Sequence, residues 1–274
     1  MSDPSKLNHA AVSNTDSWRY AVLFATVAGT LILIMLQPAM PQDVTYHAFA
    51  DARSYIGIPN FFDVTSNLPF LIVGAAGVMH CRSGDVAGYR PGWLTLFAGV
   101  AMISLGSGYY HLSPDNRTLV WDRLPMTIGF MGLFVALLSD YLRPRIGRTL
   151  LLPALLTGMF SVFYWHFTDD LRLYYWVQFM PLLTVLVVVF LFRPSYSRQW
   201  MLIASLGFYM LGKFAELYDR EIFALLQGSV SGHTLKHLLS AAGCLTLLLM
   251  LVNREPVSGA RAFLPDRSVR SPRS

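Results

Sequence analysis

The chain alternates between long apolar stretches and short polar segments over most of its length. Each apolar stretch is about 20 residues long, which is what an α-helix needs to cross the roughly 30 Å of hydrocarbon in a bilayer. We predict eight membrane-spanning helices, at about 19–38, 62–80, 93–111, 123–141, 149–167, 173–192, 200–218 and 233–252. The seventh is the weakest, because Lys213 and Glu216 interrupt its apolar pattern.

The first stretch has some features of a secretory signal, since Lys6 and Arg19 precede it. Its uncharged part, residues 20–42, is long for a signal, and Pro38 and Pro41 end it without a clear cleavage site between small residues. We therefore interpret it as a retained span.

Composition supports a membrane protein. Hydrophobic residues make up 54% of the 274 positions and charged residues 14%, whereas soluble domains carry about a quarter charged residues. This composition also excludes disorder over most of the chain. Two cysteines are too few for a disulfide framework. The net charge of +5 does not indicate nucleic-acid binding, because the basic residues cluster between apolar stretches.

The polar segments differ in charge on the two sides of the predicted bundle. The side with both termini holds fourteen Lys and Arg residues, and the opposite side holds five, together with ten carboxylates. By the positive-inside rule, both termini are expected in the cytoplasm and the acidic loops in the periplasm or an organelle lumen. An even number of spans agrees with this. The basic tail, 253–274, lacks apolar periodicity and is expected to be disordered.

Five polar residues fall inside the predicted spans at similar depth. Ser107 and His111 are four residues apart near the outer end of the third span, and His233 and His237 are four apart at the outer start of the eighth. This spacing puts both members of a pair on one helix face. Asp122 lies near the outer start of the fourth span. Ionisable residues at membrane depth are costly and therefore indicate function.

Three imidazoles at one depth predict a zinc site at His111, His233 and His237. Three protein ligands leave the fourth tetrahedral position for water, which zinc activates by lowering its pKa to about 7. Asp122 could then orient that water and move its proton, and Ser107 could hydrogen-bond the developing oxyanion. The alternative is that these residues only join membrane helices through hydrogen bonds. Two i, i+4 pairs and an aspartate at matched depth favour the metal.

The sequence around these residues resembles the alkaline ceramidase family, within a membrane-hydrolase superfamily that includes adiponectin-receptor-like and hemolysin III-like proteins. The family pattern is Ser-x3-His, an Asp eleven residues later and a late His-x3-His. The matching segments are NFFDVTSNLPF at 60–70, GSGYYH at 106–111, WDRLPM at 121–126, ELYDREIF at 216–223 and GHTLKHLLSAAG at 232–243. The resemblance implies that the three histidines bind zinc, with Ser107 and Asp122 assisting the water.

The resemblance predicts an all-α integral membrane fold, with a seven-transmembrane-helix hydrolase core preceded by one extra N-terminal helix. We divide the chain into 1–59 (N-terminus, extra helix and outer loop), 60–252 (catalytic core) and 253–274 (tail). The animal enzymes bind calcium through an acidic segment that ends in a Glu. Asn60 stands where that Glu would fall, which puts calcium binding in doubt.

The resemblance also implies a substrate, a ceramide-like membrane lipid whose amide is cleaved to a sphingoid base and a fatty acid. The expected partners are thus this lipid and the bilayer, with no nucleic acid. Two alternatives remain at this stage: a hydrolase of another lipid amide or ester, and a receptor-like protein in which zinc is structural. The two polar residues beside the histidines argue against the second, because a structural zinc needs no proton acceptor.

Overall fold

A computed structural model describes residues 17–83 and 86–257, and these residues are helical with no β-strand. A π-helical segment, Ala25–Gly29, joins the first two helices, and a 3₁₀ turn, Val44–His47, lies in the following loop. The α-helices are α1 Ser17–Phe24, α2 Thr30–Met35, α3 Phe61–Thr65, α4 Leu68–Arg82, α5 Arg90–Leu112, α6 Asn116–Tyr141, α7 Pro144–Thr168, α8 Arg172–Leu191, α9 Trp200–Leu217, α10 Asp219–Leu225 and α11 Gly232–Asn253.

Within the described residues, seven helical segments are long and apolar enough to cross a membrane. They are α1 to α2 taken together, α3 to α4 taken together, α5, α6, α7, α8 and α11. The predicted all-α, multi-pass membrane fold with an extra N-terminal helix is therefore confirmed. The seventh predicted span corresponds to α9, which is not among these seven segments and which contains Lys213 and Glu216.

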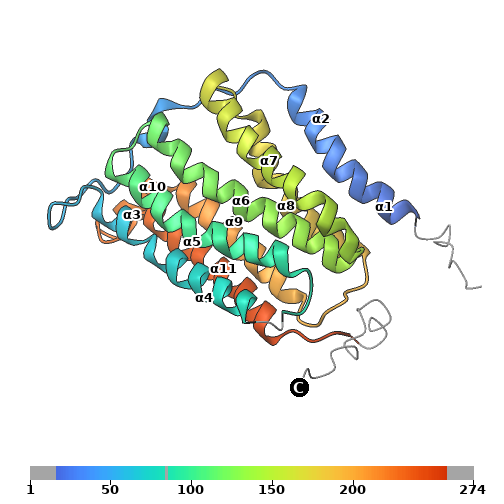
Figure 1. Ribbon diagram of the computed structural model, residues 1–274. Helices are drawn as coiled ribbons and strands as arrows, with labels where there is room; N and C mark the ends of the chain where they lie inside the picture. The colour runs from blue at the N-terminus through green and yellow to red at the C-terminus, as the bar shows by residue number, and fades with distance from the viewer. Residues whose placement is uncertain (1–16, 84–85, 258–274) are drawn as a thin grey trace, which may run out of the picture.

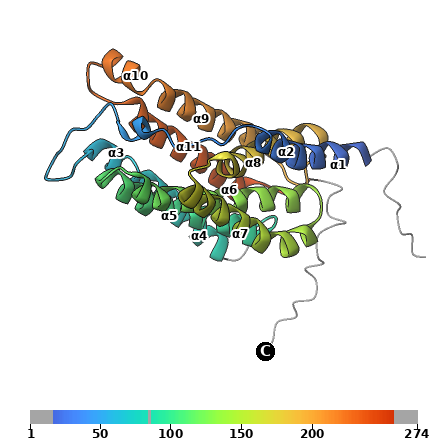
Figure 2. The ribbon, with the colours of Figure 1, turned by 90° about the horizontal axis from the view of Figure 1, so that it is seen from above.

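The helices form two layers (Figure 2). Helices α4, α5, α6 and α7 make one layer, in which α5 packs between α4 and α6. Helices α8, α9 and α11 make the other, in which α9 and α11 lie side by side. Helix α6 is the most buried of the candidate spans. The start of α1 and the end of α11 lie at the same end of the bundle, and α3 and α10 lie at the opposite end (Figure 1).

The N-terminal helix lies at the edge of the bundle, against α8 (Figure 1). The Trp176 indole N–H on α8 lies 3.2 Å from the Val27 carbonyl oxygen and 3.1 Å from the Thr30 hydroxyl. Val27 is within the π-helical segment, where the i to i−4 hydrogen-bond ladder is interrupted and a carbonyl can accept from a neighbour. The extra helix is thus joined to the core by a specific polar contact.

Several helix bounds differ from the prediction near the outer ends of the spans. Helix α6 begins seven residues before the predicted start at 123, because Asp115 caps it and accepts hydrogen bonds from the backbone N–H groups of Arg117 and Thr118. Asp122 is therefore in the second turn of α6. The second predicted span is broken between α3 and α4 at residues 66–67. Helix α10 was not predicted.

Candidate metal centre

The three predicted ligands converge at the end of the bundle that holds α3 and α10. His111 lies in the last turn of α5, and the Asn60 amide donates a 2.8 Å hydrogen bond to its carbonyl oxygen. His233 and His237 lie in the first two turns of α11. The Asp219 carboxylate accepts a 2.7 Å hydrogen bond from the backbone N–H of His233. Hydrogen bonds from neighbouring elements therefore hold the backbone at His111 and His233.

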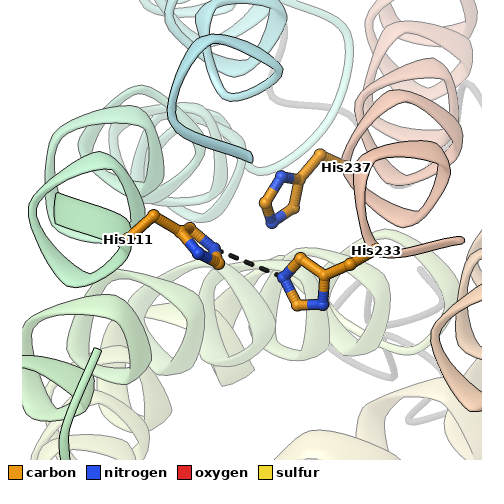
Figure 3. A group of neighbouring side chains, drawn as sticks. All are labelled: His111, His233 and His237. Atoms are coloured by element: carbon orange, nitrogen blue, oxygen red, sulfur yellow. Dashed lines mark hydrogen bonds between the residues drawn. The ribbon is translucent and has the colours of Figure 1, made fainter. Parts of the chain in front are cut away.

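The histidine side chains face one another in the bundle interior (Figure 3). Their ligand nitrogens all lie within 4.8 Å of one another. All three side chains are buried: His111 is 1% exposed, and His233 and His237 are each 3% exposed. Among the described residues, this is the only group of three or more metal-type ligands so arranged. Two of the nitrogens, His111 Nε2 and His233 Nε2, are 3.3 Å apart.

This geometry fits zinc. With Zn–N distances of about 2.0–2.1 Å, two ligands of a tetrahedral site lie about 3.3–3.4 Å apart, and the Nε2 atoms of His111 and His233 match that separation. Neutral imidazole is a suitable zinc ligand. The donor set thus accommodates a tetrahedral metal with one open position.

The hydrogen bonds of Ser66 define the tautomer of His237. The Ser66 hydroxyl lies 2.7 Å from His237 Nδ1 and 3.1 Å from the Asp63 carbonyl oxygen. A carbonyl can only accept, so the hydroxyl donates to it and its oxygen accepts from the Nδ1–H of His237. The Nε2 lone pair of His237 is then free for a metal. Such hydrogen bonds to the non-ligating nitrogen are typical of metal-binding histidines.

His111 lacks an equivalent hydrogen bond. Its Nδ1 is buried and has no hydrogen-bond partner in the described part of the chain. Ring packing orients the side chain instead: the ring centroids of Phe49 and Tyr110 lie 4.7 and 4.8 Å from that of His111. Phe49 also lies 4.4 Å from the His233 ring. A loop residue thus covers two of the three histidines.

The loop around Phe49 is held in place by polar contacts on both sides. His47 lies 2.8 Å from the Tyr110 hydroxyl, and the backbone N–H of Ala50 donates a 2.8 Å hydrogen bond to Asp219. Farther along the loop, Asp51 accepts hydrogen bonds from the Arg53 guanidinium. Burial raises the pKa of Asp51, but these hydrogen bonds outweigh it and leave that pKa below its usual value. The loop is therefore an ordered cover over the histidines.

Ser107 and Asp122 line the same cavity as His237. Both residues are buried, and the Ser107 side chain lies near the Asp122 carboxylate. Helices α5 and α6 can approach closely here because Gly106 has no side chain: a Cβ at this position would collide with the Trp121 carbonyl oxygen. The structure thus brings together all five residues that the sequence singled out.

The cavity extends between the two helix layers and has a volume of about 140 Å³. Its walls are mostly apolar, with Phe70, Leu96 and Val185 among them, and its polar groups include Ser107 and Asp122. On α11, the lining runs from His237 to Leu247, ten residues apart, which at 1.5 Å per residue is about 15 Å. The space is suited to an acyl chain with a polar group at one end.

A group of charged side chains adjoins the histidines, and its arrangement could not be predicted from the sequence. Lys236 Nζ lies 2.9 Å from Glu216 Oε1 and 3.2 Å from His233 Nε2. Glu216 also pairs with Lys213. Lys236 lies between the two predicted ligands of α11, but its pairing with a residue of α9 is a long-range contact. Ser66 and Phe49 were missed for the same reason.

His166 is not part of the histidine group. His166, which the sequence placed near the outer face, is exposed and contacts its neighbours Trp165 and Phe167. Asn60, which replaces the expected calcium-binding Glu, donates its amide to His111, as described above.

The basic tail, 253–274, was predicted to be disordered, but its first residues are ordered: Asn253 ends α11, Arg254 pairs with Asp140, and Pro256 forms a β-bridge with Tyr196. The rest of the tail, beyond 257, lies outside the described residues.

Comparisons with known proteins show the family of the chain. A search of curated proteins gave no match. A family model described as Ceramidase matches residues 54–253. The matched region includes α3 to α11, and therefore all three histidines, Ser107 and Asp122. Because this match covers well over half of the 274 residues, the chain belongs to the ceramidase family.

Proposed function

We propose that this protein is a zinc-dependent amide hydrolase that acts within the membrane and cleaves ceramide-like lipids to a sphingoid base and a fatty acid. Membership of the ceramidase family supports ceramide hydrolysis. The observation that carries the proposal is the convergence of three buried imidazoles, one of which, His237, lines an apolar cavity together with Ser107 and Asp122. Zinc bound there would polarise the amide carbonyl and supply a water with a pKa near 7.

The apolar walls of the cavity would bind the acyl chain and place its amide beside the histidines. Asp122 would accept a proton from the attacking water and return it to the leaving amine. Ser107, one helix turn before His111, would donate a hydrogen bond to the carbonyl oxygen as negative charge develops on it. The loop around Phe49 would limit access of bulk water from outside the bundle.

The direct test measures zinc content and hydrolysis of a fluorescent ceramide on the same purified samples. The wild type should contain one zinc per chain and release fluorescent fatty acid. The His233→Ala, His237→Ala double variant should lose both, because a single imidazole holds zinc poorly. His166→Ala is a matched control, since this exposed histidine lies outside the group. Full zinc content in the double variant would contradict the proposed ligands.

We also propose that both termini are cytoplasmic and that the histidines lie near the periplasmic or lumenal face. The support is the excess of Lys and Arg on the side that holds the termini. In this orientation the substrate enters from the membrane, and the reaction takes place near the headgroup level of the outer leaflet.

A further inference from the structure

Lys236 is a cationic side chain that faces the cavity beside a proposed metal ligand. It lies on α11 between His233 and His237, and it lines the same cavity as Ser107 and Asp122. The Lys236 side chain is mostly buried, and 18% of it is exposed. A buried ammonium is costly unless it has partners, so its position calls for a specific role.

The hydrogen-bonding capacity of Lys236 exceeds the number of its protein acceptors. An ammonium has three N–H donors and no acceptor. One donor reaches Glu216 Oε1 at 2.9 Å, and a second is directed at His233 Nε2 at 3.2 Å. If His233 Nε2 binds zinc, its lone pair is no longer available to Lys236. At least one further donor is then left for an oxygen in the cavity.

The position of Lys236 is set by its neighbours. The Glu216 carboxylate is shared by two ammonium groups, Lys213 and Lys236, and the Asp122 carboxylate of the same cavity lies within electrostatic range of Lys236. The Tyr46 hydroxyl donates a further hydrogen bond to Glu216, at 3.3 Å. Glu216 thus holds Lys236 in position at the cavity and leaves N–H donors of the ammonium for a ligand oxygen.

We propose that Lys236 binds the acyl oxygen of the lipid amide and, after cleavage, the carboxylate of the fatty acid product. This inference rests on the proposed function. Hydrolysis joins the oxygen of water to the acyl carbon, breaks the C–N bond and transfers a proton to the amine, and the resulting acid loses its proton to become a carboxylate. Lys236 is thus a residue that selects for a carboxylate on the acyl chain.

A purely structural role makes a different prediction. If Lys236 only orients Glu216 and His233, its loss should weaken zinc binding and should affect charged and uncharged ligands equally. Direct binding separates the two roles without measuring turnover. The ligands are palmitate and hexadecanol, which have the same chain length but differ in charge. Binding to the zinc-loaded full chain in detergent micelles can be measured by displacement of a fluorescent fatty acid.

We expect Lys236→Met to weaken palmitate binding about 10- to 100-fold, as for loss of a hydrogen bond to a charged group. Hexadecanol binding and zinc content should stay unchanged. Lys236→Arg, which keeps the charge, should retain most of the palmitate affinity. Lys213→Met is the matched control, because Lys213 shares Glu216 but does not line the cavity. It should bind palmitate within about threefold of the wild type.

Three results would overturn the inference: unchanged palmitate binding in Lys236→Met, an equal loss for both ligands, or loss of zinc from this variant. Lys236→Gln, which keeps an N–H donor without the charge, provides the same test if the Met variant does not fold. Failure of the proposed function has a different signature. In that case the wild type would not cleave ceramide, yet its preference for palmitate would still depend on Lys236.

Discussion

The hydrogen bond between Ser66 and His237 provides a sharp test of the proposed metal centre, because Ser66 is not itself a ligand. In Ser66→Ala, the Nδ1–H of His237 loses an acceptor at 2.7 Å, and the ring is freer to rotate or to change tautomer. Ser66 is buried, so bulk water cannot readily replace the hydroxyl. The expected effect is weaker zinc binding with the fold intact.

The magnitude follows from the contacts of His237. Loss of a hydrogen bond to the non-ligating nitrogen typically lowers metal affinity 10- to 100-fold, or about 1.4–2.7 kcal/mol. The Asp63 carbonyl oxygen accepts from the same Ser66 hydroxyl and so lies near His237 Nδ1, where it can take over part of this interaction. We therefore expect a loss near the lower limit, about tenfold.

The assay is competition for zinc between the purified protein and a chelator of known affinity. The control is Ser161→Ala, because Ser161 is also buried and donates a hydrogen bond to a carbonyl three residues earlier, but it lies on α7 away from the histidines. Its zinc affinity should match the wild type. Wild-type affinity in a folded Ser66→Ala, or an equal loss in the control, would refute the role assigned to Ser66.

Three further predictions concern the reaction, the topology and acid stability. Asp122→Asn and Ser107→Ala should both keep zinc. The kcat for a fluorescent ceramide should fall about 10²- to 10⁴-fold in Asp122→Asn and about 10²- to 10³-fold in Ser107→Ala. Normal turnover in Asp122→Asn would exclude Asp122 as the proton acceptor. The topology can be tested by placing a single cysteine at Pro114, in the turn between α5 and α6, after Cys81 and Cys244 are replaced. This cysteine should react with an impermeant thiol reagent added outside intact cells. Labelling only after lysis would show that the topology is the reverse of the proposed one. Hydrogen bonds from Arg172 lower the pKa of Asp170 to about 2, whereas the pKa of an Asp in an unfolded chain is about 3.9. This carboxylate therefore stabilises the fold above pH 4, and its contribution is lost as the pH falls toward 2. The thermal unfolding midpoints of the wild type and of Asp170→Asn should therefore converge as the pH falls from about 4 to about 2. A constant difference between the two midpoints would contradict the stabilising role of the ionised Asp170.

Much of the architecture could be predicted from the sequence, because a membrane requires long apolar helices and these are visible as apolar stretches. The i, i+4 pairs Ser107/His111 and His233/His237 could be placed on single helix faces from spacing alone. Because successive spans cross the membrane in opposite directions, both pairs and Asp122 could then be placed at the same end of the bundle. These inferences need only local sequence and the direction of each helix.

Helix ends were predicted less well, because they depend on polar residues that a count of apolar positions ignores. Helix α6 begins at Asn116 because Asp115 and Thr118 form a capping box. Its first turn, which contains Asn116 and Arg117, is too polar to be included in an apolar stretch. The contacts of Phe49 and Ser66 with the histidines join residues far apart in the chain, and no local pattern encodes them.

The charges that weaken α9 as a membrane helix are the same charges that adjoin the proposed metal centre. Glu216 and Lys213 interrupt the apolar pattern of this segment, and Glu216 pairs with Lys236 beside His233. Ionisable groups within a bundle are unfavourable unless they are paired, and even a paired group contributes little net stability. An apolar residue in place of Glu216 would give a more stable span, so this charge is better explained by its pairing with Lys236, which lines the cavity. The weakest span of the sequence is thus the one that supplies the carboxylate that positions Lys236.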